Sequence, residues 1–186
     1  MAVGLGPLPT LHPVPGFELG IASAGIKRPG RKDVVVMRCA EGSRVAAVTT
    51  TNAFCAAPVI VTRERFRGDV RYLLTNTGNA NAGTGADGLR NARRACAALA
   101  ALTGVEETAV LPFSTGVIGE PLPVEKIEGA LQAALDDLSV DHWAEAATGI
   151  MTTDTLPKGA SRQFEYDGVT VTVTGISKGA GMIRPN

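Results

Sequence analysis

A run of hydroxyl and glycine residues, Ser114–Gly119, directly follows Thr108–Phe113, whose apolar and β-branched residues predict a strand. Where a strand ends, the Thr115 hydroxyl and the Gly116 backbone N–H can project together, since glycine permits close backbone approach. Paired donors of this kind stabilise the negative charge of a tetrahedral intermediate. The run by itself therefore fits either an ordinary strand-end turn or an oxyanion hole.

Two later segments place polar groups where a ligand could meet them. Thr152–Lys158 carries three hydroxyls, a carboxylate and an amine, and Pro157 discourages continuation of any helix. Asp154 could bind a polar ligand or brace a turn. In Ser177–Ile183, two glycines closely follow Lys178, so the backbone can bend while the ammonium contacts a ligand or remains solvated.

Gly83–Gly88 matches G-x-G-x-x-G, the motif of a dinucleotide site. However, Gly83 lies seven positions beyond Asn76, where the preceding strand is predicted to end, whereas a dinucleotide fold needs its first glycine in the tight turn. No lysine follows Gly83 to make a phosphate loop. The alternative is a winding loop whose glycines and asparagines supply positive backbone angles.

The composition favours a globular enzyme or binding protein for a small molecule. A chain of 186 residues, 45% of them hydrophobic, is long and apolar enough for a core, and we expect one domain over residues 1–186. Eighteen basic and eighteen acidic residues cancel, which favours neither nucleic acid nor an anionic membrane as a partner. No positive residue precedes Lys27, and the longest apolar run, Ala95–Leu102, is too short to span a bilayer. We therefore expect a cytoplasmic location.

Histidine and cysteine offer no catalytic or metal-binding pattern. His12 and His142 are isolated, so the sequence offers no histidine pattern typical of a Ser-His-Asp or Cys-His hydrolase. Cys39, Cys55 and Cys96 form no C-x-x-C pair and no zinc-ligand spacing, and we expect them to be small core residues. We expect no metal.

The order of predicted elements indicates an α/β (α+β) fold, a layered sandwich with a largely antiparallel or mixed sheet. Four β-branched runs predict four strands before any helix: Val34–Cys39, Arg44–Thr50, Pro58–Thr62 and Val70–Asn76. Apolar residues at helical spacing predict helices over Asp87–Thr103 and Pro123–Leu138, and Ser139 is expected to cap a third.

The two ends of the chain differ in character. Residues 1–30, rich in Pro and Gly, predict an extended wrap. Asp167-Gly168 between Arg162–Tyr166 and Val169–Ile176 predicts a β-hairpin with a tight turn.

Together these segments resemble the ornithine acetyltransferase (glutamate N-acetyltransferase) family. Six motifs occur in the order found in that family: Gly25–Lys27; Thr51–Ala53 with Ala56–Val59; Asn76–Ala82; Ser114–Gly119; Met151–Lys158; and Lys178–Asn186. One departure is Thr77, where the family usually has Ser; the hydroxyl is retained.

The resemblance implies the N-terminal-nucleophile-like fold of the ornithine acetyltransferase and aminopeptidase superfamily. It also implies a precursor that cleaves itself before a threonine. This chain would then be the α chain, ending at Asn186 just short of the cleavage point, and the nucleophilic threonine would open the β chain. The family pattern implies an α2β2 heterotetramer.

The resemblance also assigns roles to individual residues. It implies that Thr115 and Gly116 form the oxyanion hole and that Thr155 and Lys178 bind substrate. The implied reaction belongs to arginine biosynthesis. It moves the acetyl group of N-acetylornithine to glutamate in a ping-pong cycle without a cofactor, with acetyl-CoA as a possible second donor.

Two other functions fit parts of the sequence. The related self-cleaving aminopeptidase and amidohydrolase branch would release an acyl group to water. A non-catalytic module for a small ligand could instead be built around Gly78–Gly88.

Overall fold

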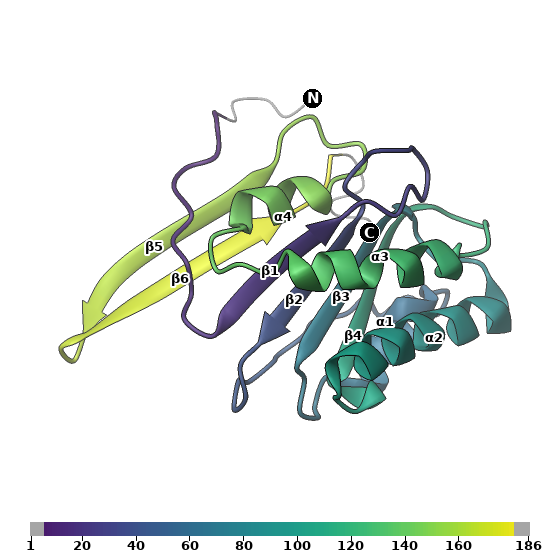
Figure 1. Ribbon diagram of the computed structural model, residues 1–186, viewed down its shortest axis with the longest axis horizontal. Helices are drawn as coiled ribbons and strands as arrows, with labels where there is room; N and C mark the ends of the chain where they lie inside the picture. The colour runs from purple at the N-terminus through teal and green to yellow at the C-terminus, as the bar shows by residue number, and fades with distance from the viewer. Residues whose placement is uncertain (1–5, 181–186) are drawn as a thin grey trace.

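A mixed four-stranded sheet forms the centre of the fold in a computed structural model that describes residues 6–180 (Figure 1). Its strands lie in chain order: β1 (Phe17–Ala22), β2 (Val34–Cys39), β3 (Tyr72–Asn79) and β4 (Val110–Val117). β1, β2 and β3 pair antiparallel, whereas β3 and β4 pair parallel. Parallel neighbours need a crossover, and α2 (Gly85–Thr103) supplies it. β3 and β4 therefore run toward the same edge of the sheet.

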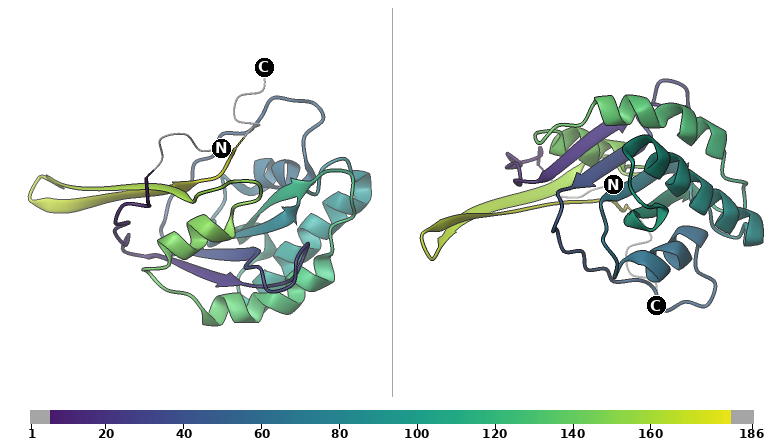
Figure 2. Two further views of the ribbon diagram at one scale, coloured as in Figure 1. Left: turned by 90° about the horizontal axis from the view of Figure 1, so that it is seen from above. Right: turned by 60° about the horizontal axis from the view of Figure 1, so that its bottom comes forward.

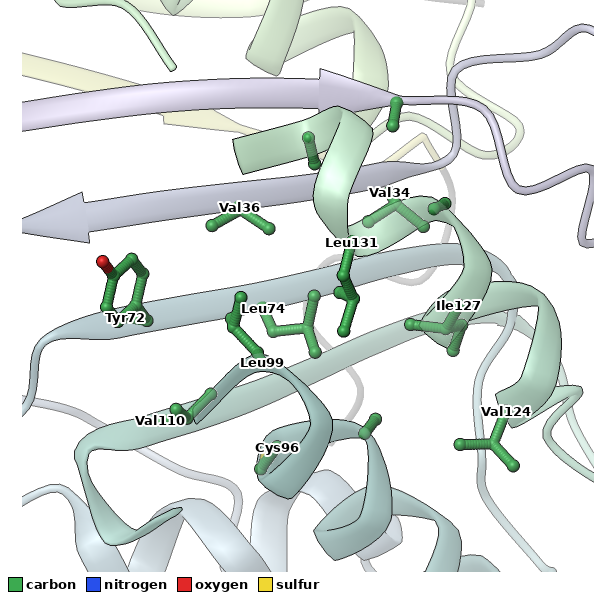
Figure 3. Packing of buried hydrophobic residues seen from close by; sticks show 14 of the residues in the cluster. Val34, Val36, Tyr72, Leu74, Cys96, Leu99, Val110, Val124, Ile127 and Leu131 are labelled. Atoms are coloured by element: carbon green, nitrogen blue, oxygen red, sulfur yellow. The ribbon is translucent and has the colours of Figure 1, made fainter. Parts of the chain in front are cut away.

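Two helices cover one face of this sheet. In β2, Val34 and Val36 pack in the same cluster as Leu99 of α2 and Leu131 of α3 (Val124–Asp136), and Figure 3 shows these side chains together. Val35, between them, belongs to the cluster on the opposite face, as alternation along a strand requires. β2 is thus buried on both faces, which explains its unbroken β-branched run.

A short helix, α4 (Trp143–Gly149), packs against the opposite face. Its Trp143 ring stacks on Phe17 at the start of β1, with ring centroids 5.2 Å apart. Ile150, just after the helix, lies in the same cluster as Ile21 and Val35. The remaining helices are α1 (Ala57–Arg65), which contacts β4 and α2, and the 3-10 helix η1 (Glu107–Ala109) before β4.

A long hairpin extends away from the central sheet. β5 (Lys158–Tyr166) and β6 (Val169–Ser177) pair antiparallel, and Figures 1 and 2 show the tip reaching well beyond the helices. Asp167 and Gly168 have φ of 51° and 74°, the positive values that a two-residue turn of this hand requires. The base of the hairpin is tied to the N-terminal segment, because the Thr174 hydroxyl donates to the His12 carbonyl at 2.7 Å.

The expected fold class is confirmed: the chain is α+β, with one mixed and one antiparallel sheet. The predicted strands at Val34–Cys39 and Val70–Asn76, both long helices and the hairpin are present, with ends shifted by a few residues. Other predictions were wrong, in whole or in part.

Pro58–Thr62 is helical, as part of α1, and not a strand. Pro58 lies in the first helical turn, where its fixed φ suits a helix, and Val61 is buried against the α2 side chain of Ala92. Packing therefore overrides the β-branched preference.

Arg44–Thr50 forms no strand, and Val48 is fully exposed, so this run has no sheet neighbour to cover it.

The N-terminal stretch is only partly an extended wrap, because it contains β1, which pairs with β2 through Phe17↔Cys39 to Ala22↔Val34. Ser139 does not cap α4, which begins at Trp143 after His142. Ser139 instead exchanges backbone hydrogen bonds with Leu19, a short bridge that extends the edge of β1.

The thiols are free. Cys39 and Cys96 are buried as expected, and burial raises the pKa of the Cys96 thiol to about 12, so it stays protonated. Cys55 was wrongly predicted to lie in the core: it is only half-buried, with its sulfur 3.8 Å from Arg63 Nη1. No helix within residues 6–180 has the length and hydrophobicity needed to cross a membrane.

Candidate functional site

A cleft of about 640 Å³ opens where β3 and β4 end, facing the segments before β5 and after β6. Each of the six sequence motifs contributes to its lining. The lining residues include Lys27, Ala56, Gly78, Ala80, Ala82, Ser114–Ile118, Thr152, Thr153 and Lys178–Ala180. Segments spread over 150 residues of sequence therefore meet at one place, which a set of unrelated turns would not do.

The parallel pairing of β3 and β4 places two predicted site residues at the cleft. Thr115 lies opposite Thr77, and Gly116 opposite Gly78, at the bulged end of the pair. A side chain at Gly116 would overlap the backbone of Gly78 and Asn79, and its φ of 142° also favours glycine. Glycine is therefore needed here for the two strands to approach closely.

Asparagines fix the loop that follows β3. The Asn76 amide donates to the Asn79 carbonyl at 3.0 Å, and the Asn79 side chain accepts the Asn81 N–H at 2.7 Å. Asn81 in turn donates to the Gly88 carbonyl at 2.9 Å, while a Cβ at Gly88 would overlap the Thr84 side chain. The glycine-rich run thus packs the first turn of α2 against this loop.

Lys178 connects the two sheets. It follows β6, and its ammonium donates to the Thr115 hydroxyl at 2.8 Å and to the Thr152 hydroxyl at 2.9 Å. A hydroxyl that accepts a hydrogen bond from an ammonium still has its own proton to donate elsewhere. Lys178 therefore favours Thr115 as a hydrogen-bond donor, which is what an oxyanion hole requires.

The described cleft is lined by cations and by no carboxylate. Lys27, Arg28, Arg31 and Lys178 contribute to it, and none of them forms an ion pair with a described Asp or Glu. Arg31 donates to the backbone carbonyls of Met151 and Thr152, which hold its position without neutralising its charge. The cleft is thus suited to a ligand with a carboxylate or another anionic group.

Asp154 is a buried carboxylate next to this cleft. Its Oδ1 accepts the Lys158 ammonium and the Gly179 N–H, both at 2.6 Å, and its Oδ2 accepts the Thr152 N–H at 3.3 Å. Burial by itself would raise the pKa of Asp154. The hydrogen bonds from Lys158, Gly179 and Thr152 outweigh burial and lower the pKa to about 2.

This lowered pKa predicts an acid-sensitive contribution to stability. The contribution is present above the pKa of about 4 that an unfolded Asp has, and is lost as the pH falls toward 2. Thermal unfolding between pH 2 and 6 should therefore show a smaller acid-induced decline for Asp154→Asn than for the wild type. Asp87→Asn, which removes an exposed carboxylate, is the control and should follow the wild-type curve. Parallel curves for wild type and Asp154→Asn would contradict the prediction.

The comparisons with known proteins agree with the convergence of the six motifs. Residues 18–186 match the model of the ArgJ family. The chain belongs to the ArgJ family. The family prediction drawn from the motifs is thereby confirmed.

Relatives of this ArgJ-family chain include the arginine biosynthesis bifunctional proteins ArgJ of Pseudomonas syringae pv. tomato and Pseudomonas fluorescens. They are 84% and 81% identical to it over all 186 residues, which make up 46% of each relative. The chain therefore spans about half the length of the curated relatives it matches.

Two solved structures share the fold. The arginine biosynthesis bifunctional protein ArgJ of Bacillus halodurans is 37% identical with a TM-score of 0.83, covering 92% of this chain and 91% of that one. The ornithine acetyltransferase of Mycobacterium tuberculosis, complexed with ornithine, is 31% identical with a TM-score of 0.85, covering 96% and 97%.

The structure of this ArgJ-family chain brings three of the four predicted site residues together: Thr115, Gly116 and Lys178 all line the cleft. Thr155 is exposed and follows the buried Asp154; from this segment, the cleft is lined by Thr152 and Thr153. The roles of all four residues stay predictions. The last motif is only partly described, since residues 181–186, and with them the expected cleavage point, lie outside the described residues.

Two cleft features were missed from the sequence of this ArgJ-family chain. Arg31 belongs to no quoted motif, although the run of cations between Lys27 and Lys32 was a visible signal. Thr152 was noted only as one of three hydroxyls, and nothing local indicated its contact with Lys178. Within residues 6–180 there is no group of three His, Cys, Asp or Glu side chains placed to hold a metal ion.

Proposed function

We propose that this chain is one half of a two-chain ornithine acetyltransferase of arginine biosynthesis, which moves the acetyl group of N-acetylornithine to glutamate. The observation that carries the proposal is the meeting of Thr115, Gly116 and a lysine-bound hydroxyl pair in one cation-lined cleft. Ornithine bound to the Mycobacterium tuberculosis relative, and the arginine biosynthesis named for the Pseudomonas relatives, support the substrate class.

In the proposed cycle, the threonine that opens the second chain attacks the acetyl carbonyl carbon, and the amine of that threonine takes the hydroxyl proton. The Thr115 hydroxyl and the Gly116 N–H stabilise the oxyanion, ornithine leaves with a proton, and the acetyl group stays on the threonine. The amine of glutamate then attacks the acetyl ester and regenerates the threonine. Lys178 binds the substrate carboxylate, and Thr155 contributes a further contact. No cofactor is needed.

The proposed partner is the other half of the same precursor, joined as an α2β2 heterotetramer. The curated relatives are more than twice as long as this chain, whereas the solved chains that it matches are about as long as it is. This difference supports a protein made of two chains. A largely apolar cavity of about 490 Å³, lined by Met37, Leu73 and Phe113 among others, supports a partner covering that face of the sheet.

We further propose that residues 1–186 form one domain of this enzyme and that the enzyme works in the cytoplasm. The term bifunctional in the relatives' names supports a second acetyl donor, acetyl-CoA, acting at the same threonine. The rival function is hydrolysis, in which water replaces glutamate as the acceptor from the same acyl intermediate.

The test uses the complete protein, obtained by expressing the whole precursor. With N-acetylornithine and glutamate, we expect N-acetylglutamate and ornithine in equal amounts, and a denatured mass spectrum with this chain and a second, threonine-opened chain. With N-acetylornithine alone, one equivalent of ornithine per second chain should be released rapidly, leaving that chain acetylated. Acetate release without N-acetylglutamate would indicate the hydrolase, and an uncut, inactive polypeptide would count against the proposal.

A further inference from the structure

One buried carboxylate, that of Asp154, connects three segments around the cleft. Its side chain is 0% exposed and accepts hydrogen bonds from Thr152 before β5, from Lys158 at the start of β5 and from Gly179 just after β6. Asp154 itself does not line the cleft. It therefore acts on the site only through the groups that it holds.

The hydrogen bonds around Asp154 require an ionised carboxylate at this position. Three donors converge on two carboxylate oxygens, two of them on Oδ1. An asparagine is the same size but presents one oxygen and one NH2 group. It would therefore turn a donor toward at least one of the three donors, which would lose its hydrogen bond.

The bond to Gly179 bears directly on Lys178. Lysine has a flexible four-carbon stem, so its ammonium can reach many positions unless the backbone beneath it is fixed. Gly179 has a φ of 145°, which favours glycine, the residue with the freest backbone, and its N–H donates to Asp154 Oδ1 at 2.6 Å. The same carboxylate holds the Thr152 backbone, and the Thr152 hydroxyl is one of the two acceptors of Lys178.

We propose that Asp154 is a positioning residue for acyl transfer, which places the Lys178 ammonium on the hydroxyls of Thr115 and Thr152 by fixing the backbone at Gly179 and Thr152. This inference rests on the proposed function of the cleft. It predicts that Asp154 matters to the reaction only while Lys178 is present. A purely structural ion pair with Lys158 would instead affect stability alike with or without Lys178.

A double-mutant cycle in the complete two-chain protein separates these roles. Asp154→Asn should lower kcat at least about tenfold, because a small displacement of a catalytic contact is costly, and should raise KM as well, because Lys178 also binds the substrate carboxylate. In a Lys178→Met background, Asp154→Asn should lower kcat further by less than about twofold. Independent, multiplying effects of the two substitutions would overturn the proposal.

Lys158→Met is the matched control, because it removes the ion pair of Asp154 but leaves the bonds to Gly179 and Thr152. Its kcat should stay within about threefold of the wild type. A loss equal to that of Asp154→Asn would show that the ion pair is what matters. If Asp154→Asn does not fold because Lys158 is left unpaired, Asp154→Asn with Lys158→Met removes both charges, and the same cycle against Lys178→Met is then measured.

Hydrogen exchange gives a readout that does not depend on activity. The Gly179 amide should exchange faster in Asp154→Ala, which removes its acceptor outright, than in Lys158→Met, and mass spectrometry of the peptide containing Gly179 can measure this. Equal exchange would overturn the positioning role. An inactive wild-type protein would contradict only the proposed function, since the exchange experiment still tests Asp154.

Discussion

We expect Thr115→Val to lower kcat for acetyl transfer by roughly a hundredfold or more, with little effect on KM. Valine keeps the shape and β-branching of threonine at the end of β4 but removes the hydroxyl. That hydroxyl accepts a hydrogen bond from Lys178 at 2.8 Å, and its own proton is left for the oxyanion. The interaction forms in the transition state, so its loss should appear in kcat more than in KM.

The measurement is steady-state transfer from N-acetylornithine to glutamate by the complete protein. Thr148→Val is a suitable control, because the Thr148 hydroxyl donates to the Ala144 carbonyl within α4, outside the cleft. Native mass and melting temperature should match the wild type for both variants. Near-normal turnover of Thr115→Val would remove Thr115 from the oxyanion hole.

Gly116→Ala should damage both stability and activity. A methyl group at this position would overlap the backbone of Gly78 and Asn79, where no side chain can move aside, and φ at Gly116 is 142°. We expect a loss of at least about 2 kcal/mol in the free energy of unfolding, because β3 and β4 must separate to make room. Since Thr115 lies in the same strand end, acetyl transfer should fall at least about a hundredfold as well.

Gly129→Ala provides the control for that substitution. Gly129 is exposed in α3, nothing lies within 4 Å of a Cβ there, and alanine is the better helix former. The control should be neutral or stabilising by up to about 1 kcal/mol. Chemical unfolding measures both variants, and wild-type stability of Gly116→Ala would contradict the packing described for β3 and β4.

Much of the fold could be predicted because its signals are local. Ala92, Cys96 and Leu99 recur at helical spacing and are buried in α2. Asp167 and Gly168 specify the turn of the hairpin within two residues. Pro58–Thr62 was mispredicted because its five residues fit either a strand or a helix. The decision came from contacts with α2 that the sequence does not display.

The candidate site, too, could be predicted only in part from the sequence. Ser114–Gly119 and Thr152–Lys158 could be singled out because hydroxyls and glycines concentrate there. Their meeting could not be predicted, since the Lys178–Thr115 hydrogen bond joins residues 63 positions apart. The burial of Asp154 was equally hidden, because a carboxylate in a turn is usually solvated.

The contact between Lys178 and Thr115 also sets the stage of folding at which the cleft can form. Lys178 follows β6, the last strand of the described chain, while Thr115 ends β4, so the site cannot form until both sheets exist. A chain still leaving the ribosome carries Thr115 and Gly116 long before it carries the ammonium that completes them. The Lys178–Thr115 contact can therefore form only after β6 has been made and its end has docked against the end of β4.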